Sequence, residues 1–140
     1  MAEEYWAGFR PQPQKVEGEL VSFEVTVHSP LAHGEAFARV TTPAGAGTWA
    51  TAVRKLDPRP GGRIELVVWD GLLAEGAFAQ IALGKSVHFT LDAFGLVEVQ
   101  FSPLEAGTRI SLRCSKIVES DDRDLFEGNA KKLLAAIAAS

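Results

Sequence analysis

The side chains that most often carry chemistry are few in this sequence, and their spacing indicates neither a metal site nor a cofactor. Among His28, His33 and His88, no two stand four residues apart on a predicted helix, and none has a carboxylate at a ligand spacing. His28 and His88 fall on the polar phase of predicted strands. We therefore interpret the histidines as solvated surface residues rather than metal ligands.

Nucleophilic and acid–base catalysis are not indicated either. Cys114 falls on the apolar phase of the last predicted strand, where a free cysteine behaves as a small hydrophobic residue. Glu98 lies on the polar phase of its strand, and Asp121, Asp122 and Asp124 are explained by their position at the start of a helix. The sequence contains no Gly-x-Ser-x-Gly, P-loop or dinucleotide fingerprint. We predict no catalytic residue.

Large apolar side chains are more numerous than a thin layer of sheet and helix needs. Any one of them is most simply explained as core, but as a set they favour a cavity for a small apolar ligand. Trp69 departs from the pattern, because its strand phase is opposite to that of the apolar residues before it. We predict that the ligand-binding residues are Phe37, Trp49, Trp69, Phe78, Phe89, Phe126 and Leu133.

Seven segments are predicted to be strands, and most of them carry the alternation of apolar and polar residues that is typical of half-buried strands. In one of them, Val87, Phe89 and Leu91 alternate with Ser86, His88 and Thr90. Turn residues rich in glycine, proline and aspartate separate the segments. The predicted strands are 19–28, 51–56, 63–70, 73–82, 86–91, 96–101 and 108–116.

The region after the first strand predicts one or two short helices. We expect helical structure within 31–40, with Ser29 as its cap and Pro30 at the first helical position. The glycine-rich segment 41–47 predicts a mobile corner.

The C-terminal segment 121–139 changes from a period of two to the helical period, and its apolar residues form one stripe. This is the one long element that could cover the apolar face of the sheet. The predicted fold is therefore α+β, with one curved antiparallel sheet of about six or seven strands around a C-terminal helix. The stripe consists of either Leu125 or Phe126, followed by Ala130, Leu133, Leu134 and Ile137.

Length, charge and cysteine content bound the class of protein. The 140 residues predict one domain, and the net charge of −4 argues against a nucleic-acid-binding protein. One cysteine cannot form an internal disulfide. No stretch reaches the roughly 20 apolar residues that a membrane span needs, and no signal peptide is visible, so we expect a cytoplasmic protein.

We divide the chain into an N-terminal extension, 1–15, and a domain, 16–140. The extension carries Tyr5, Trp6 and Phe9 ahead of a proline-rich stretch that cannot join a sheet ladder. Three alternatives remain open for these aromatics. They form the interface of a homodimer, they fold back over the mouth of the domain's own pocket, or they belong to a terminus that is only partly ordered.

Three motifs in order resemble one protein family. Segment 36–43 reads Ala-Phe-Ala-Arg-Val-Thr-Thr-Pro, and Trp49 follows six residues after the proline. Segment 57–63 reads Asp-Pro-Arg-Pro-Gly-Gly-Arg, and 107–112 reads Gly-Thr-Arg-Ile-Ser-Leu. The chain thereby resembles the helix-grip (SRPBCC) superfamily of START domains, pollen-allergen-like proteins and polyketide cyclases. Within it, the nearest likeness is to the bacterial branch named for the activator of the heat-shock protein 90 ATPase (AHSA-type).

The resemblance implies a helix-grip fold and three classes of function. The first is a non-enzymatic binder of a small hydrophobic or lipid-like ligand, held between the sheet and the C-terminal helix. The second, which the AHSA name suggests, is a protein-interaction module that regulates a chaperone. The third is a cyclase or hydrolase, which is disfavoured because no acid–base pair stands out in the sequence.

Overall fold

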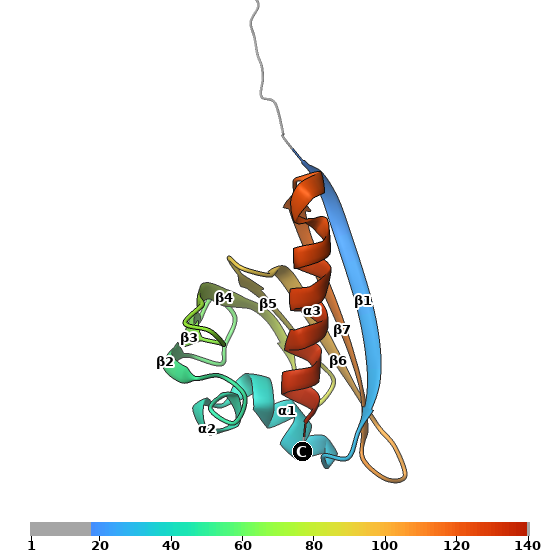
Figure 1. Ribbon diagram of the computed structural model, residues 1–140. Coiled ribbons are helices and arrows are strands. Elements are labelled where there is room, and N and C mark those ends of the chain that lie inside the picture. The colour runs from blue at the N-terminus through green and yellow to red at the C-terminus, as the bar shows by residue number, and fades with distance from the viewer. Residues whose placement is uncertain (1–17, 140) are drawn as a thin grey trace, which may run out of the picture.

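The computed structural model describes residues 18–139, which form one curved antiparallel sheet and three α-helices (Figure 1). The proposed N-terminal extension lies outside the described residues. The sheet order is β1-β7-β6-β5-β4-β3-β2, and every neighbouring pair is antiparallel. The strands are β1 (Glu19–Ser29), β2 (Ala52–Leu56), β3 (Arg63–Val67), β4 (Leu73–Ala82), β5 (Ser86–Leu91), β6 (Gly95–Pro103) and β7 (Thr108–Val118).

The predicted α+β helix-grip architecture is confirmed. The sheet remains open, with β1 and β2 at its two edges, and it curves around α3 (Arg123–Ala138) (Figure 1). Helix α3 packs on β1 and β7, while α1 (His33–Thr41) packs on β5 and β6 at the C-terminal end of α3. The concave face of the sheet therefore has a closed end beside α1 and an opposite end where α3 begins.

Alternation determines which side chains reach the concave face. In β5, Val87, Phe89 and Leu91 are all buried, whereas the residues between them are half-buried or exposed. The predicted stripe of α3 is buried against this face, as its helical period required. Gly76 of β4 lies so close to β5 that a Cβ there would overlap the Thr90 carbonyl. The absence of a side chain at this position lets the two strands approach where the sheet curves.

The turn between β3 and β4 corrects one predicted strand. We predicted a strand over 63–70, but β3 ends at Val67. Asp70 and Gly71 both have positive φ, 52° and 73°, and the Leu72 amide donates to the Trp69 carbonyl at 2.9 Å. This is the geometry of a tight Asp-Gly hairpin turn. Trp69 lies beyond the end of β3 and is the first residue of this turn, which reverses the chain directly after it.

The capping role predicted for Ser29 is wrong. Helix α1 begins at His33, four residues later, and its N-cap Ala32 makes no side-chain hydrogen bond. The Ser29 hydroxyl instead donates to the Ala138 carbonyl at 2.6 Å and accepts from the Leu31 amide at 3.2 Å. This buried serine therefore has both a donor and an acceptor partner, and its bond to Ala138 joins the end of β1 to the end of α3.

The corner after α1 contains a further helical turn, α2 (Pro43–Ala46). The Thr42 hydroxyl accepts a hydrogen bond from the Gly45 amide at 2.9 Å and so caps it. The prediction of one or two short helices in this region is confirmed. At the start of α3, the N-cap Asp122 makes no side-chain hydrogen bond, so only its charge favours the helix there.

Candidate functional site

The residues predicted to bind a ligand all belong to the hydrophobic core or pack against it. Trp49 and Trp69 are half-buried. Burial of the set agrees with the sequence analysis, but it leaves the ligand contact a prediction. The fully or almost fully buried members are Phe37, Phe78, Phe89, Phe126 and Leu133.

The structure joins these aromatics in separate pairs rather than in one ring. Phe78 and Phe89 lie directly opposite each other in β4 and β5, with ring centres 6.0 Å apart. Phe126 packs instead on Phe23 of β1, at 5.7 Å. Both distances fall within the range of favourable aromatic contacts. Phe23, which the predicted set omitted, could have been found from the apolar alternation of its strand.

Phe37 and Trp49 lie near the closed end of the concave face. Phe37 of α1 packs edge-on against Phe101 of β6, with ring centres 5.4 Å apart. The Trp49 indole donates to the Arg39 carbonyl at 2.8 Å. This hydrogen bond ties the chain after α2 to α1. Trp49 therefore has a structural partner that its sequence position did not reveal.

Trp69 packs beside α3. Its ring contacts Phe94 edge-on at 5.8 Å, and the Lys132 ammonium lies over it, 4.8 Å from the ring centre. The Lys132 side chain also approaches the Asp70 carboxylate at 3.9 Å. The hairpin turn thus brings Trp69 against the helix, where a cation–π contact helps to hold it.

A groove of about 330 Å³ opens where α3 begins. It lies between the turn that joins β5 to β6, the end of β7 and the first turns of α3. Two of its apolar side chains are unusually exposed for their type, Ile117 at 55% and Leu125 at 65%. Of the predicted ligand residues, Phe126 is the one that lines it. The full lining is Ala93, Lys116, Ile117, Val118, Glu119, Asp122, Leu125, Phe126 and Asn129.

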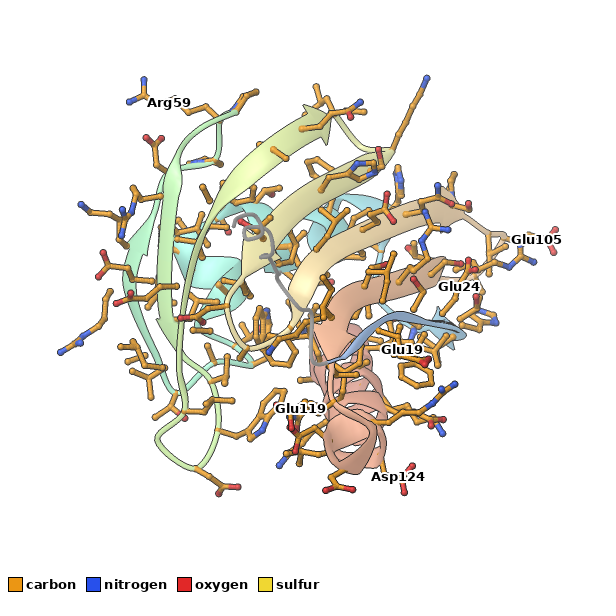
Figure 2. The ribbon with its side chains drawn as sticks, turned by 90° about the horizontal axis from the view of Figure 1, so that it is seen from above. Glu19, Glu24, Arg59, Glu105, Glu119 and Asp124 are labelled. Carbon is orange, nitrogen blue, oxygen red and sulfur yellow. The ribbon has the colours of Figure 1, made fainter. Side chains whose placement is uncertain are left out.

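Charge around this end of the molecule is mixed but mostly acidic. Figure 2 looks along α3 and shows Glu19, Glu119 and Asp124 around this end. The counter-charges are Lys116, which lines the groove, and Arg123, whose guanidinium lies over the Phe23 ring at 5.6 Å. A smaller hollow of about 100 Å³, which Arg123 also lines, adjoins Val118 and Glu119 on the β1 side. The groove therefore has apolar walls and a polar rim.

A row of polar residues on the convex face was missed by the sequence analysis. Cross-strand pairing aligns Glu24 of β1, Arg113 of β7, Glu98 of β6 and His88 of β5. Arg113 donates to one oxygen of Glu98 at 2.6 Å and 2.7 Å, and His88 Nδ1 lies 3.9 Å from the other. The row borders a hollow of about 130 Å³. Only strand register, which the sequence analysis did not assign, would have revealed this alignment.

The histidines and the cysteine can now be placed. His28 is exposed, as predicted, and its Nε2 lies 2.6 Å from the Ala106 carbonyl, whereas His33 and His88 are half-buried. Burial raises the pKa of the Cys114 thiol from 9.0 to about 12, which keeps it protonated and unreactive at neutral pH. Within residues 18–139, no three histidine, cysteine or acidic side chains are grouped so that they could hold a metal ion.

Comparisons with known proteins agree with the fold. The sequence profile of the family described as "Activator of Hsp90 ATPase homolog 1-like protein" matches residues 33–140. No curated protein matches the sequence. None of the helices within residues 18–139 has the length and apolar character to cross a membrane.

Solved structures with the same fold come from several bacteria. A protein of unknown function from Staphylococcus aureus is 16% identical, with a TM-score of 0.67 over 87% of this chain and 89% of its own. An AHSA1-like protein from Aeromonas hydrophila is 18% identical, with a TM-score of 0.67 over 84% and 90%. A protein from Mesorhizobium loti is 14% identical, with a TM-score of 0.68 over 84% and 94%. At these identities the likeness shows the fold.

Proposed function

This chain belongs to the Activator of Hsp90 ATPase homolog 1-like protein family, and we propose that it binds a small hydrophobic, lipid-like molecule without catalysing a reaction. The observation that supports the proposal is the groove at the start of α3. Its volume of about 330 Å³ lies at the lower end of the range of roughly 300–1,000 Å³ that is usual for ligand sites. The ligand is therefore small.

The lining of the groove favours an apolar ligand. Phe126 is buried at its base, and Ile117 and Leu125 stand exposed at its sides. Removing apolar surface from water contributes about 25 cal/mol per Å², so a ligand that covers the two exposed side chains gains affinity from both. The Lys116 ammonium and the Asn129 amide at the rim supply the few polar groups that orient a ligand in such a site.

Of the predicted aromatics, only Phe126 lines the groove, and the others lie in the core or pack against it. Ala93 of the groove is followed in sequence by Phe94, which contacts Trp69. Because Phe94 is fully buried and neither it nor Trp69 lines the groove, a ligand would meet these two rings only after the side chains around them had rearranged. Deeper residues such as Phe78 and Leu133 would be reached only if α3 moved away from the sheet.

Binding of the neutral fluorescent probe N-phenyl-1-naphthylamine tests the proposal. Leu125→Arg places a charge at the side of the groove and removes its most exposed apolar side chain. Leu83→Arg is the matched control, because Leu83 is 86% exposed in the turn between β4 and β5 and does not line the groove. We expect Leu125→Arg to weaken probe binding about tenfold, which corresponds to about 1.4 kcal/mol.

Two outcomes of this titration would contradict the proposal. Wild-type protein that does not bind the probe would leave the groove without a ligand of this class. Equal loss of binding in the Leu125→Arg and Leu83→Arg variants would mean that the probe reports general surface hydrophobicity. Circular dichroism of both variants ensures that the comparison is made between folded proteins.

A chaperone-regulating protein-interaction module is the second candidate. It is supported by the name of the family and by Leu20 and Ile117, a cross-strand pair that is 71% and 55% exposed beside the groove. Native mass spectrometry of protein purified from cells separates the two candidates. A co-purifying small apolar mass supports the ligand binder, whereas a bound chaperone together with an empty groove supports the module.

A cyclase or hydrolase is less well supported by the geometry. His88 and Glu98 are the pair that strand register brings together, and they lie on the convex face, away from the groove. An acid–base pair in that position cannot act on a ligand held between the sheet and α3.

A further inference from the structure

We propose that the edge strand β1 is an interface between two copies of this chain, which pair their β1 strands antiparallel to form one continuous sheet. β1 runs for eleven residues, Glu19–Ser29, and all of them are in register with β7 without a bulge. Within residues 18–139 no strand pairs with its other side (Figure 1). Its outward backbone N–H and C=O groups thus present a long, uninterrupted template for another strand.

The opposite edge strand, β2, has features that prevent pairing with a strand of another molecule. β2 has five residues, and its pairing with β3 is interrupted by a bulge between Val53 and Lys55. Arg54 and Lys55 place exposed positive charges along it. Short length, bulges and lysines are the usual means by which proteins prevent edge pairing. β1 has none of these three and contains no proline.

The concave side of β1 is incompletely covered. Phe23, Val25 and Val27 point toward α3, yet all three remain half-buried, because no element lies beyond the edge within the described residues. A second β1 strand, pairing in a register centred on Val25, would place Val27 of the second copy opposite Phe23 and the two Val25 side chains opposite each other. Such apolar cross-strand pairs stabilise a sheet.

The convex side favours an identical partner in the same register. Centring on Val25 places Glu24 opposite Thr26 of the second copy and Ser22 opposite His28. A shift of the centre to Glu24 would instead bring two carboxylates face to face, which is unfavourable. The alternation of β1 is nearly symmetric about Val25, with apolar residues on one face and polar residues on the other. A twofold axis is the commonest symmetry of soluble oligomers. An axis through the pair of Val25 residues would form each of these cross-strand contacts twice.

Light scattering of the full chain tests the proposal by mass. We expect a dimer of about twice 15.0 kDa whose population rises with protein concentration. Val25→Lys introduces an inward-pointing charge at the edge, and we expect it to convert the dimer to a monomer. Val53→Lys is the matched control, because Val53 is a half-buried valine of the other edge strand, and it should leave the dimer intact.

Cross-linking tests the register and does not depend on the stability of the lysine variants. Cys114 is buried and protonated, so it does not compete with an introduced thiol. We expect Ser22→Cys and His28→Cys proteins to form a disulfide-linked dimer on mild oxidation when they are mixed, and not when either is oxidised alone. This result follows because the two positions face each other only across the twofold axis.

Two results would overturn the proposal. One is a wild-type protein that stays monomeric at the highest attainable concentration. The other is a dimer that survives Val25→Lys while the mixed cysteine variants fail to cross-link. The second result would favour the alternative interface through the N-terminal aromatics Tyr5, Trp6 and Phe9.

Discussion

Replacing Leu133 with alanine measures how tightly the space between the sheet and α3 is filled. Leu133 is at the centre of the buried stripe of α3 and has 0% exposure, so the full transfer free energy of each removed carbon group is lost. The substitution removes three carbon groups, at about 0.8 kcal/mol each, and so costs about 2.4 kcal/mol in transfer free energy. The cavity left behind adds a further cost, and similar leucine-to-alanine changes in packed cores total about 2.7–5.0 kcal/mol.

We therefore expect the free energy of unfolding to fall by about 4 kcal/mol in Leu133→Ala. With a urea m-value of about 2 kcal/mol per molar, the midpoint of urea unfolding would fall by about 2 M. Leu125→Ala is the matched control on the same helix, because Leu125 is 65% exposed and should change stability by less than about 0.5 kcal/mol. Unfolding is followed by far-ultraviolet circular dichroism.

A loss below about 1.5 kcal/mol with an unchanged m-value would refute this reasoning, because the transfer term alone exceeds it. Leu133 would then border a void that already exists beneath α3, and the ligand would bind more deeply than the groove. Restoration of the lost stability by an apolar ligand would support the same conclusion.

Further predictions concern the curvature of the sheet, the thiol and the tryptophans. Gly76→Ala should lower the free energy of unfolding by several kcal/mol or prevent folding, because the added Cβ would overlap the Thr90 carbonyl. A variant with the urea-unfolding midpoint of the wild type would contradict this. Cys114 should resist iodoacetamide at pH 8 in the folded protein and react in urea. Its pKa is raised on folding, so its contribution to stability is complete below about pH 9 and is lost between about pH 9 and 12, by at most about 1.4 kcal/mol per pH unit. Binding of N-phenyl-1-naphthylamine should change the tryptophan fluorescence of the protein, and Trp69→Phe should remove most of this change. Trp49→Phe should remove little of it, because Trp49 lies beside α1. The reverse result would place the probe at the closed end of the concave face.

Periodicity predicted the fold well because it is a local signal with a strong physical cause. The strands 73–82 and 86–91 have the boundaries expected from alternation, since one face of each lies against the core. The errors fall where a different local interaction decides. The Asp70–Gly71 turn ended β3 early, and the hydrogen bond from Ser29 to Ala138, 109 residues away, replaced the expected helix cap.

The candidate site was less predictable because it depends on contacts between distant elements. The sequence indicated that Phe78 and Phe89 of the strands and Phe126 of the helical stripe turn inward, and they do. It could not indicate which rings meet, since the pairing of Phe126 with Phe23 depends on how α3 lies across β1. The same holds for His88 and Glu98, which approach each other only through the register of β5 and β6.

The groove lies where three elements end, and element ends are the part of a sequence that periodicity determines least. Ile117 and Leu125 illustrate the difficulty. Both are large apolar side chains, yet Ile117 falls on the outward phase of β7, in step with the exposed Arg113, and Leu125 lies one position before the buried stripe of α3. Their exposure therefore distinguishes a candidate surface from the core, and that the two side chains line one groove becomes visible only when the ends of β7 and α3 are placed side by side. This is the physical reason to mutate these two residues, rather than the buried aromatics, when ligand binding is tested.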